Sequence, residues 1–207
     1  MRKKRPIART EGLTRDASLV VIASEDRYAV KQYFDRFRST RIQFRVLETE
    51  RGQSSPQHVQ QRLQAYMREY DFGEGDQFWL VCDTDHWIES NHISNLVAVV
   101  RWCRQQGIGV ALSNPCFDLW LLLHVDRFPT ESNLTCEEVG NKIRAVVGQY
   151  NKTKVYNLPI TDQGVRRAIG ASKAHQPTAG DIPSEPQTAV HLIIDALIAR
   201  NVISVRT

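Results

Sequence analysis

The sequence has no long hydrophobic run, since none of its apolar stretches approaches the roughly 20 residues that a membrane-spanning helix needs. Its start also lacks the apolar segment of a signal peptide. We therefore expect a cytoplasmic protein with no membrane partner. Its 207 residues, 42% hydrophobic and 24% charged, have the composition of an ordinary globular domain that can bury a sizeable core.

Cysteine is scarce, and several familiar motifs are missing. The four cysteines show no C-x-x-C spacing, which predicts reduced, packed thiols and argues against a zinc site. The chain has no Walker-type phosphate loop, no G-x-G-x-x-G, no H-E-x-x-H and no G-x-S-x-G. These absences argue against the nucleotide-binding, zinc-protease and serine-hydrolase classes that depend on those motifs.

Positive charge is in excess, with a formal net charge of +4, and much of it lies before the first predicted strand. We define residues 1–17 as a basic N-terminal arm, in which Arg2, Lys3, Lys4 and Arg5 come first. Such an arm favours a polyanion such as nucleic acid through counterion release. The alternative is a solvated tail that binds nothing.

Strand-like and helix-like segments alternate from residue 18 to about 124, a pattern typical of a parallel sheet covered by helices. We predict an α/β fold with a parallel sheet of about four strands, at about 19–23, 41–48, 78–82 and 108–112. Ser55-Pro56 and Asn114-Pro115 each resemble a helix start, with a capping residue followed by proline. The core should cover 18–130, with a helical extension, 131–207, packed on it. Within this extension, capping boxes at 135–138 and 184–187 predict helix starts.

Acidic residues follow two of the predicted strands. Asp83 and Asp85 come after the apolar run at 78–82, and Glu25 comes after the run at 19–23. Ligands of open α/β sheets gather outside the carboxyl ends of the strands, and Mg²⁺ prefers carboxylate oxygens. If the two strands are neighbours, these three side chains could hold a divalent cation. The alternative for the D-x-D pair is a turn closed by local hydrogen bonds.

A second group of candidates lies at 113–124. A helix that begins near Asn114 would direct free N–H groups toward a phosphate, and Asp118 would be a further metal ligand. His124 shares an apolar helix face, where a packed structural role is the stronger interpretation. Lys152 could neutralise charge on a scissile phosphate, although most lysines are solvated surface residues.

Together these residues resemble a known family. A strand followed by glutamate, and a later strand that ends in D-x-D, is similar to the TOPRIM domains of topoisomerases, bacterial primases and OLD-type nucleases. The string at 113–124, S-N-P-C-F-D-L-W-L-L-L-H, resembles the RloB family pattern S-N-P-x-F-E-x-W-x-x-x-H. The resemblance extends over about residues 18–200 and includes Lys152.

The resemblance implies a TOPRIM fold and metal-dependent nuclease chemistry, in a family associated with bacterial defence against phage and, commonly, an ATPase partner. By position, Glu25 matches the TOPRIM glutamate, while Asp83 and Asp85 match its D-x-D pair. Asp118 stands where the family usually has glutamate. One departure is Asp26, where the family usually has a glycine that allows unusual backbone torsions.

We therefore predict a nuclease that uses Mg²⁺ or Mn²⁺. Glu25, Asp83, Asp85 and Lys152 would be catalytic, with Asp118 as a further metal ligand and Asn114 and the basic arm on the nucleic acid. The first alternative is a catalytically degenerate TOPRIM module that binds nucleic acid or docks on an ATPase. A fragment of a primase or topoisomerase is a weaker alternative. The sequence leaves open whether the substrate is DNA or RNA, and whether the chain self-associates.

Overall fold

The computed structural model describes residues 2–4, 17–49, 52–85, 93–175, 182–201 and 203. Its sheet has five strands: β1 (Ser18–Ser24), β2 (Ile42–Leu47), β3 (Gln77–Asp83), β4 (Gly109–Asn114) and β5 (Gln187–Thr188). The helices of the first half are α1 (Ala29–Phe34), η1 (Asp35–Phe37), α2 (Pro56–Glu69) and α4 (Ile93–Gln105). Those of the second half are α5 (Asp118–Leu122), α6 (Cys136–Val147), η2 (Lys152–Asn157), α7 (Asp162–Ala174) and α8 (His191–Ala199).

The strands are ordered β2-β1-β3-β4-β5, so β1 and β3 are direct neighbours in the centre of the sheet. The first four strands pair in parallel, with Ser24 opposite Val81 near the carboxyl ends of β1 and β3. This confirms the predicted α/β architecture, and it brings the residues that follow β1 close to those that end β3.

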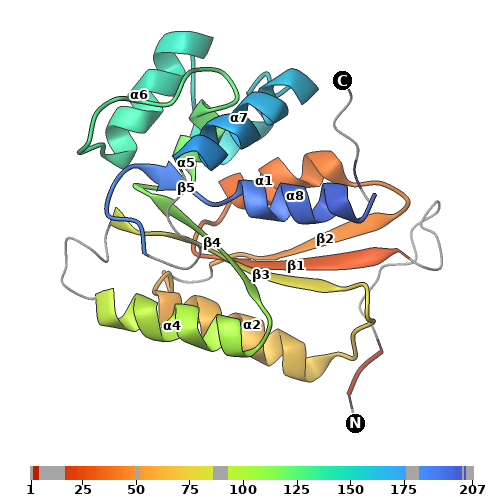
Figure 1. The fold of residues 1–207 in the computed structure, drawn as a ribbon. Coiled ribbons are helices and arrows are strands. Elements are labelled where there is room, and N and C mark those ends of the chain that lie inside the picture. The colour runs from red at the N-terminus through yellow and green to blue at the C-terminus, as the bar shows by residue number, and fades with distance from the viewer. Residues whose placement is uncertain are drawn as a thin grey trace.

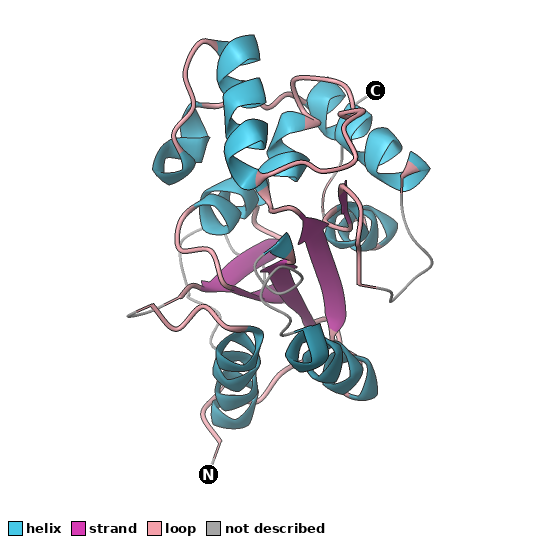
Figure 2. Cartoon of the chain, turned by 90° about the vertical axis from the view of Figure 1, so that its left-hand side faces the viewer, coloured by secondary structure: helices cyan, strands magenta, loops and turns pink. Residues whose placement is uncertain are grey.

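Helices cover both faces of the sheet, with α2 and α4 on one face and α1 and α8 on the other (Figure 1). Alternate residues of β1 therefore enter different cores, as expected for a strand that is buried on both sides. Leu19 and Val21 pack with residues of α2 and α4, whereas Val20 and Ile22 pack with residues of α1 and α8. Figure 2 turns the carboxyl ends of the strands toward the viewer and shows helices above and below them.

Two helix predictions were correct in detail. The Ser55 hydroxyl accepts a hydrogen bond from the His58 backbone N–H, and α2 begins at the following proline. Thr135 and Glu138 form the complete capping box at the start of α6. Local hydrogen bonding at these positions supports the helix that the sequence already favours.

Two other boundaries were wrong. The predicted helix start at 184–187 does not form, because Gln187 and Thr188 pair antiparallel with β4 as a fifth strand, and α8 begins only at His191. The helix expected from Asn114-Pro115 begins later, at Asp118, because Asn114 still pairs with Gln187 in the sheet. In both cases pairing within the sheet overrides a local helix signal.

The prediction that all four cysteines are reduced was wrong for two of them. Cys116 and Cys136 form a disulfide across 20 residues, with their Cα atoms 5.8 Å apart, whereas Cys82 and Cys103 are free and buried as predicted. The pairing depends on the packing of α5 against α6, which brings two distant positions together.

Among the described helices, none has both the length and the hydrophobicity to cross a bilayer.

Candidate functional site

The candidate acids lie at the carboxyl ends of β1 and β3. Glu25 follows β1 directly, and its carboxylate accepts a hydrogen bond from the backbone N–H of Asp83, the last residue of β3. The charges of Asp83 and Asp85 both act on Glu25. The structure thus brings the three predicted carboxylates of the E…D-x-D pattern together.

The start of α5 closes the site from the β4 side. Asp83 Oδ1 accepts a hydrogen bond of 2.8 Å from the backbone N–H of Phe117. The next residue, Asp118, is the first of α5, and its charge raises the pKa of Asp83. One backbone N–H predicted to meet a phosphate is therefore occupied by a carboxylate of the protein itself.

Lys152 reaches the same point from the C-terminal region. Its Nζ lies 3.4 Å from Asp26 Oδ2, 3.9 Å from Asp118 Oδ1 and 4.0 Å from Asp83 Oδ2. The lysine side chain is 40% exposed, whereas those carboxylate side chains are 6–13% exposed. One partly exposed cation therefore faces three nearly buried acids, two of which, Asp83 and Asp118, the sequence analysis had grouped with Lys152.

Burial dominates the electrostatics of the carboxylates, because it removes the water that stabilises their charged form. Burial raises the pKa of Asp83 to about 7 and also raises the pKa of Asp118. The pKa of Glu25 lies well above its usual range, through burial first and the charge of Asp83 second. Burial lowers the pKa of Lys152, but the three aspartates outweigh this effect and leave its pKa raised. The lysine therefore stays protonated, whereas Asp83 exchanges its proton near neutral pH.

Asp26 is a member of the site that the sequence analysis treated only as a departure from the family pattern. Its Oδ2 faces Lys152, and its Oδ1 accepts a hydrogen bond of 2.7 Å from the Tyr28 backbone N–H just before α1. Asp26 does not need the backbone freedom of glycine, because Asn201 is the one non-glycine residue with positive φ in the part of the chain that the structure describes. The sequence contained one signal for the position of Asp26, because an aspartate shortly before an apolar helix can accept hydrogen bonds from its first N–H groups.

The donor set of the site suits a hard divalent cation. Mg²⁺ and Mn²⁺ prefer carboxylate oxygens, and Asp118 Oδ1 is a buried atom with no hydrogen-bond partner in the structure. Glu25, Asp83, Asp85 and Asp118 are therefore the residues that would hold such an ion.

The spacing of these acids is wider than that of a closed coordination shell. In the described part of the chain, the one group of three candidate ligands within 4.8 Å of one another is Asp83 with Cys116 and Cys136. The two sulfur atoms are joined in the disulfide, so they offer no thiolate. The ammonium group of Lys152 lies within 4.0 Å of Asp26, Asp83 and Asp118.

Two other candidates lie in the protein interior. The Asn114 side-chain amide donates a hydrogen bond to the Pro183 carbonyl, and only 9% of the residue is exposed. His124 lies 3.1 Å from the Tyr33 hydroxyl through Nε2 and 2.8 Å from the Trp120 carbonyl through Nδ1. Burial lowers the pKa of His124 to about 4, so the ring is neutral at physiological pH and fits the structural interpretation.

The described part of the basic arm lies at the other end of the sheet. Arg2 donates to the Met67 carbonyl, and Lys3 pairs with Glu69 at the end of α2, while Lys4 is exposed. The dark red segment beside the end of α2 in Figure 1 marks this position. Arg5 lies outside the described residues. The structure does not bring the described part of the arm to the carboxylates.

Comparison with known proteins gives a family assignment. No curated protein and no solved structure matches the chain. A family model described as RloB-like protein matches residues 20–197, which include most of β1, the D-x-D pair, the start of α5 and Lys152. With nearly the whole chain covered, this protein belongs to the RloB-like protein family.

Proposed function

We propose that the chain is a nuclease that hydrolyses phosphodiester bonds with Mg²⁺ or Mn²⁺. One observation carries the proposal: four buried or half-buried acids and one lysine lie together at the carboxyl ends of adjacent parallel strands. They are Glu25, Asp83, Asp85, Asp118 and Lys152. Ligands of open α/β folds bind at this edge, and phosphoryl transfer depends on carboxylates that hold a cation and on a nearby positive charge. As the family resemblance implies, the cleavage would serve bacterial defence against phage.

Each residue has a distinct task in this proposal. A bound Mg²⁺ or Mn²⁺ ion supplies the positive charge that orients and polarises the phosphate. Asp83, Asp85 and Asp118 would hold the ion, and Glu25, whose carboxylate accepts a hydrogen bond from the Asp83 backbone N–H, would accept a proton or share the ion. Lys152 would stabilise negative charge on the phosphate or the leaving oxygen. Nucleic acid is the partner, and an ATPase remains a second proposed partner.

One observation favours a second function. Lys152 already supplies positive charge to Asp26, Asp83 and Asp118, and Asp26 replaces the usual glycine of the family. If Lys152 permanently takes the place of the metal ion, the chain would be a module that binds nucleic acid without cutting it. The two functions differ in whether divalent cations bind at the acidic set.

The first experiment is cleavage of mixed DNA and RNA by the purified protein with Mn²⁺ or Mg²⁺, with Asp83→Asn in parallel. Contacts to the ligands of a metal site are worth about 10–100-fold, so loss of a direct ligand should lower the rate by more than about 100-fold. Asp71→Asn is the matched control, because Asp71 is 63% exposed beside Arg2 at the opposite end of the sheet. Equal cleavage by wild type and Asp83→Asn would contradict the proposed site.

Calorimetric titration with Mn²⁺ separates the two functions when no cleavage is observed. A nuclease that lacks its partner or trigger should still bind Mn²⁺, and Asp83→Asn should abolish that binding. A wild-type protein that binds no Mn²⁺ would favour the degenerate module.

A further inference from the structure

Two aromatic side chains stand exposed next to the acidic site. Tyr28 is 40% exposed and Tyr156 is 59% exposed, and in the described part of the chain these two are the exposed aromatic residues. The other large aromatic side chains that the structure describes are buried or half-buried. An exposed ring needs a reason when a second exposed ring lies on the neighbouring element.

Both tyrosines are attached to residues of the site. The Tyr28 backbone N–H donates to the carboxylate of Asp26, which faces Lys152. Tyr156 lies in η2, the helix that begins at Lys152. A molecule that covers either ring is therefore one short step along the chain from the carboxylates.

Gln32 joins the two segments. Its backbone N–H bonds the Tyr28 carbonyl at 3.0 Å, which places the two residues one helical turn apart. Its side chain donates to the Thr153 carbonyl at 2.8 Å and accepts a hydrogen bond from the Tyr156 backbone N–H at 3.3 Å. Arg36, one turn further on, bonds the carbonyls of Val155 and Leu158. The start of α1 and η2 are thus held in a fixed arrangement.

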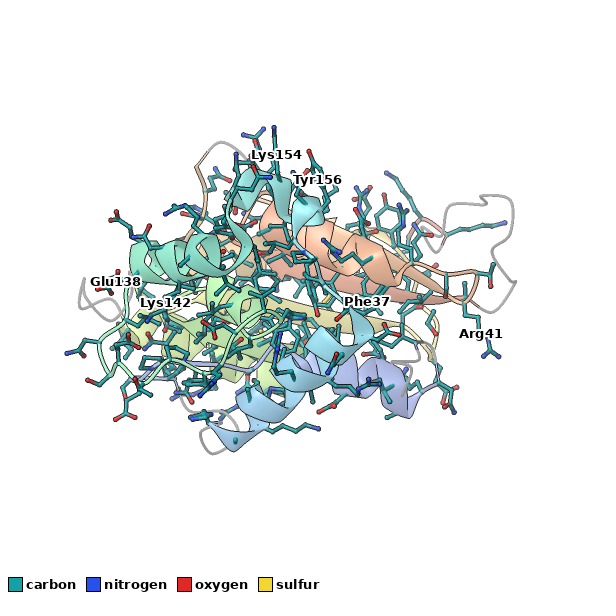
Figure 3. All side chains as sticks on the ribbon, turned by 90° about the horizontal axis from the view of Figure 1, so that it is seen from above. Phe37, Arg41, Glu138, Lys142, Lys154 and Tyr156 are labelled. Atoms are coloured by element: carbon teal, nitrogen blue, oxygen red, sulfur yellow. A yellow bond between two sulfur atoms is a disulfide. The ribbon has the colours of Figure 1, made fainter. Side chains whose placement is uncertain are left out.

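Positive charges accompany the rings. The Arg27 guanidinium lies 5.3 Å from the centre of the Tyr28 ring, and Lys154 is exposed two residues before Tyr156. Figure 3 shows Lys154 and Tyr156 side by side on η2, at the outer margin of the molecule. Exposed rings interleaved with cations are the pattern by which proteins bind single strands, with bases stacked on the rings and phosphates on the charges.

We infer that Arg27, Tyr28, Lys154 and Tyr156 form a platform for single-stranded nucleic acid that leads to the acidic site. The inference rests on the proposed function in one respect, because it names the substrate class of the same site. Bases in a duplex are stacked on each other and have no free face, whereas unpaired bases can stack on a tyrosine. The platform therefore selects single strands over duplexes.

The test is fluorescence anisotropy in EDTA, with a labelled single strand of mixed sequence and its duplex at the same ionic strength. Tyr156→Ala should weaken single-strand binding by about 5- to 100-fold, the range that corresponds to the loss of one stacked base. Tyr156→Phe should bind within about two-fold of wild type, because it keeps the ring. Ile198→Ala, another exposed apolar truncation on α8, is the matched control and should bind like wild type. Circular dichroism checks that the variants fold.

The inference is overturned if the wild-type protein does not bind the single strand, if Tyr156→Ala binds it as well as wild type, or if the duplex loses as much affinity as the single strand. Because EDTA removes divalent cations, this result does not depend on cleavage. Tyrosine-dependent binding by a protein that neither cleaves nucleic acid nor binds Mn²⁺ would support the platform and contradict the nuclease, whereas cleavage without tyrosine-dependent binding would do the reverse.

Discussion

The two ends of the sheet carry charge in opposite ways. At the carboxyl end, Asp83 and Asp118 are nearly buried, and they share the single cation of Lys152 with Asp26. At the amino end, Lys3 pairs with Glu69, and Arg2 lies 3.9 Å from Asp71, and all four of these side chains are 43–66% exposed. The first arrangement has more acids than bases and little water, whereas the second has matched pairs in solvent.

The two ends therefore differ in how much their charges affect stability. Exposed ion pairs contribute little to stability, because water and salt screen them and the long side chains lose conformational freedom. Buried acids are costly to ionise, so they alter both pKa and stability. A fold that keeps such a costly cluster at the ligand-binding edge of its sheet gains no stability from it, which is why we place function there.

The largest effect should come from Lys152→Met, which leaves Asp26, Asp83 and Asp118 without their common cation. We expect the free energy of unfolding at pH 8 to fall by about 1–2 kcal/mol, a value reduced because the lysine is 40% exposed. The loss should be smaller at pH 5, where Asp83 is protonated because its pKa is about 7. Urea denaturation at both pH values measures this, with Lys154→Met as the exposed control. An equal loss in the two variants would remove the distinction between buried and exposed charge.

Asp83→Asn should change the free energy of unfolding in the opposite direction to Lys152→Met. The folded-state pKa of Asp83, about 7, lies above its ordinary value of 3.8, so the folded protein binds more protons between these values and loses stability as pH rises. Asparagine avoids this ionisation cost. In EDTA we expect Asp83→Asn to be more stable than wild type at pH 8, by less than the full cost of ionising Asp83, because asparagine also gives up the ion pair with Lys152. The two proteins should converge near pH 4, and a gap that is independent of pH would contradict the raised pKa.

Lys3→Met should have the smallest effect, because its partner Glu69 is 43% exposed and the lysine 66% exposed. The denaturation midpoint should match that of wild type within error, in both low and high salt. A marked decrease that disappears in high salt would show that charge at the amino end also stabilises the fold.

Much of the fold was predictable because it depends on local patterns. Continuous apolar runs marked β1 and β3, and Ser55 and Thr135 marked two helix starts through backbone N–H groups within their own turn. The sequence also placed Glu25 and Asp83 at the same edge of the sheet, since parallel strands end there together, but it left open whether their two strands are adjacent.

The remaining features depend on contacts between distant parts of the chain. Lys152 meets Asp83 across 69 positions only because η2 packs against α1, and no spacing rule encodes that approach. β5 could not be predicted because a strand of two residues has no periodicity in the sequence. The Cys116–Cys136 disulfide could not be predicted because it depends on how α5 packs against α6. Asp26 was noted in the sequence as a departure from the family pattern, but its ion pair with Lys152 was not predicted.

The position of the arm has a consequence for substrate length. β1 contains seven residues, so its two ends are about 23 Å apart at roughly 3.3 Å per residue. A stacked nucleic acid strand rises about 3.4 Å per nucleotide, so about seven stacked nucleotides span the length of β1. In the proposed function, a shorter stacked strand would reach the carboxylates but not the charge at the far end of the sheet.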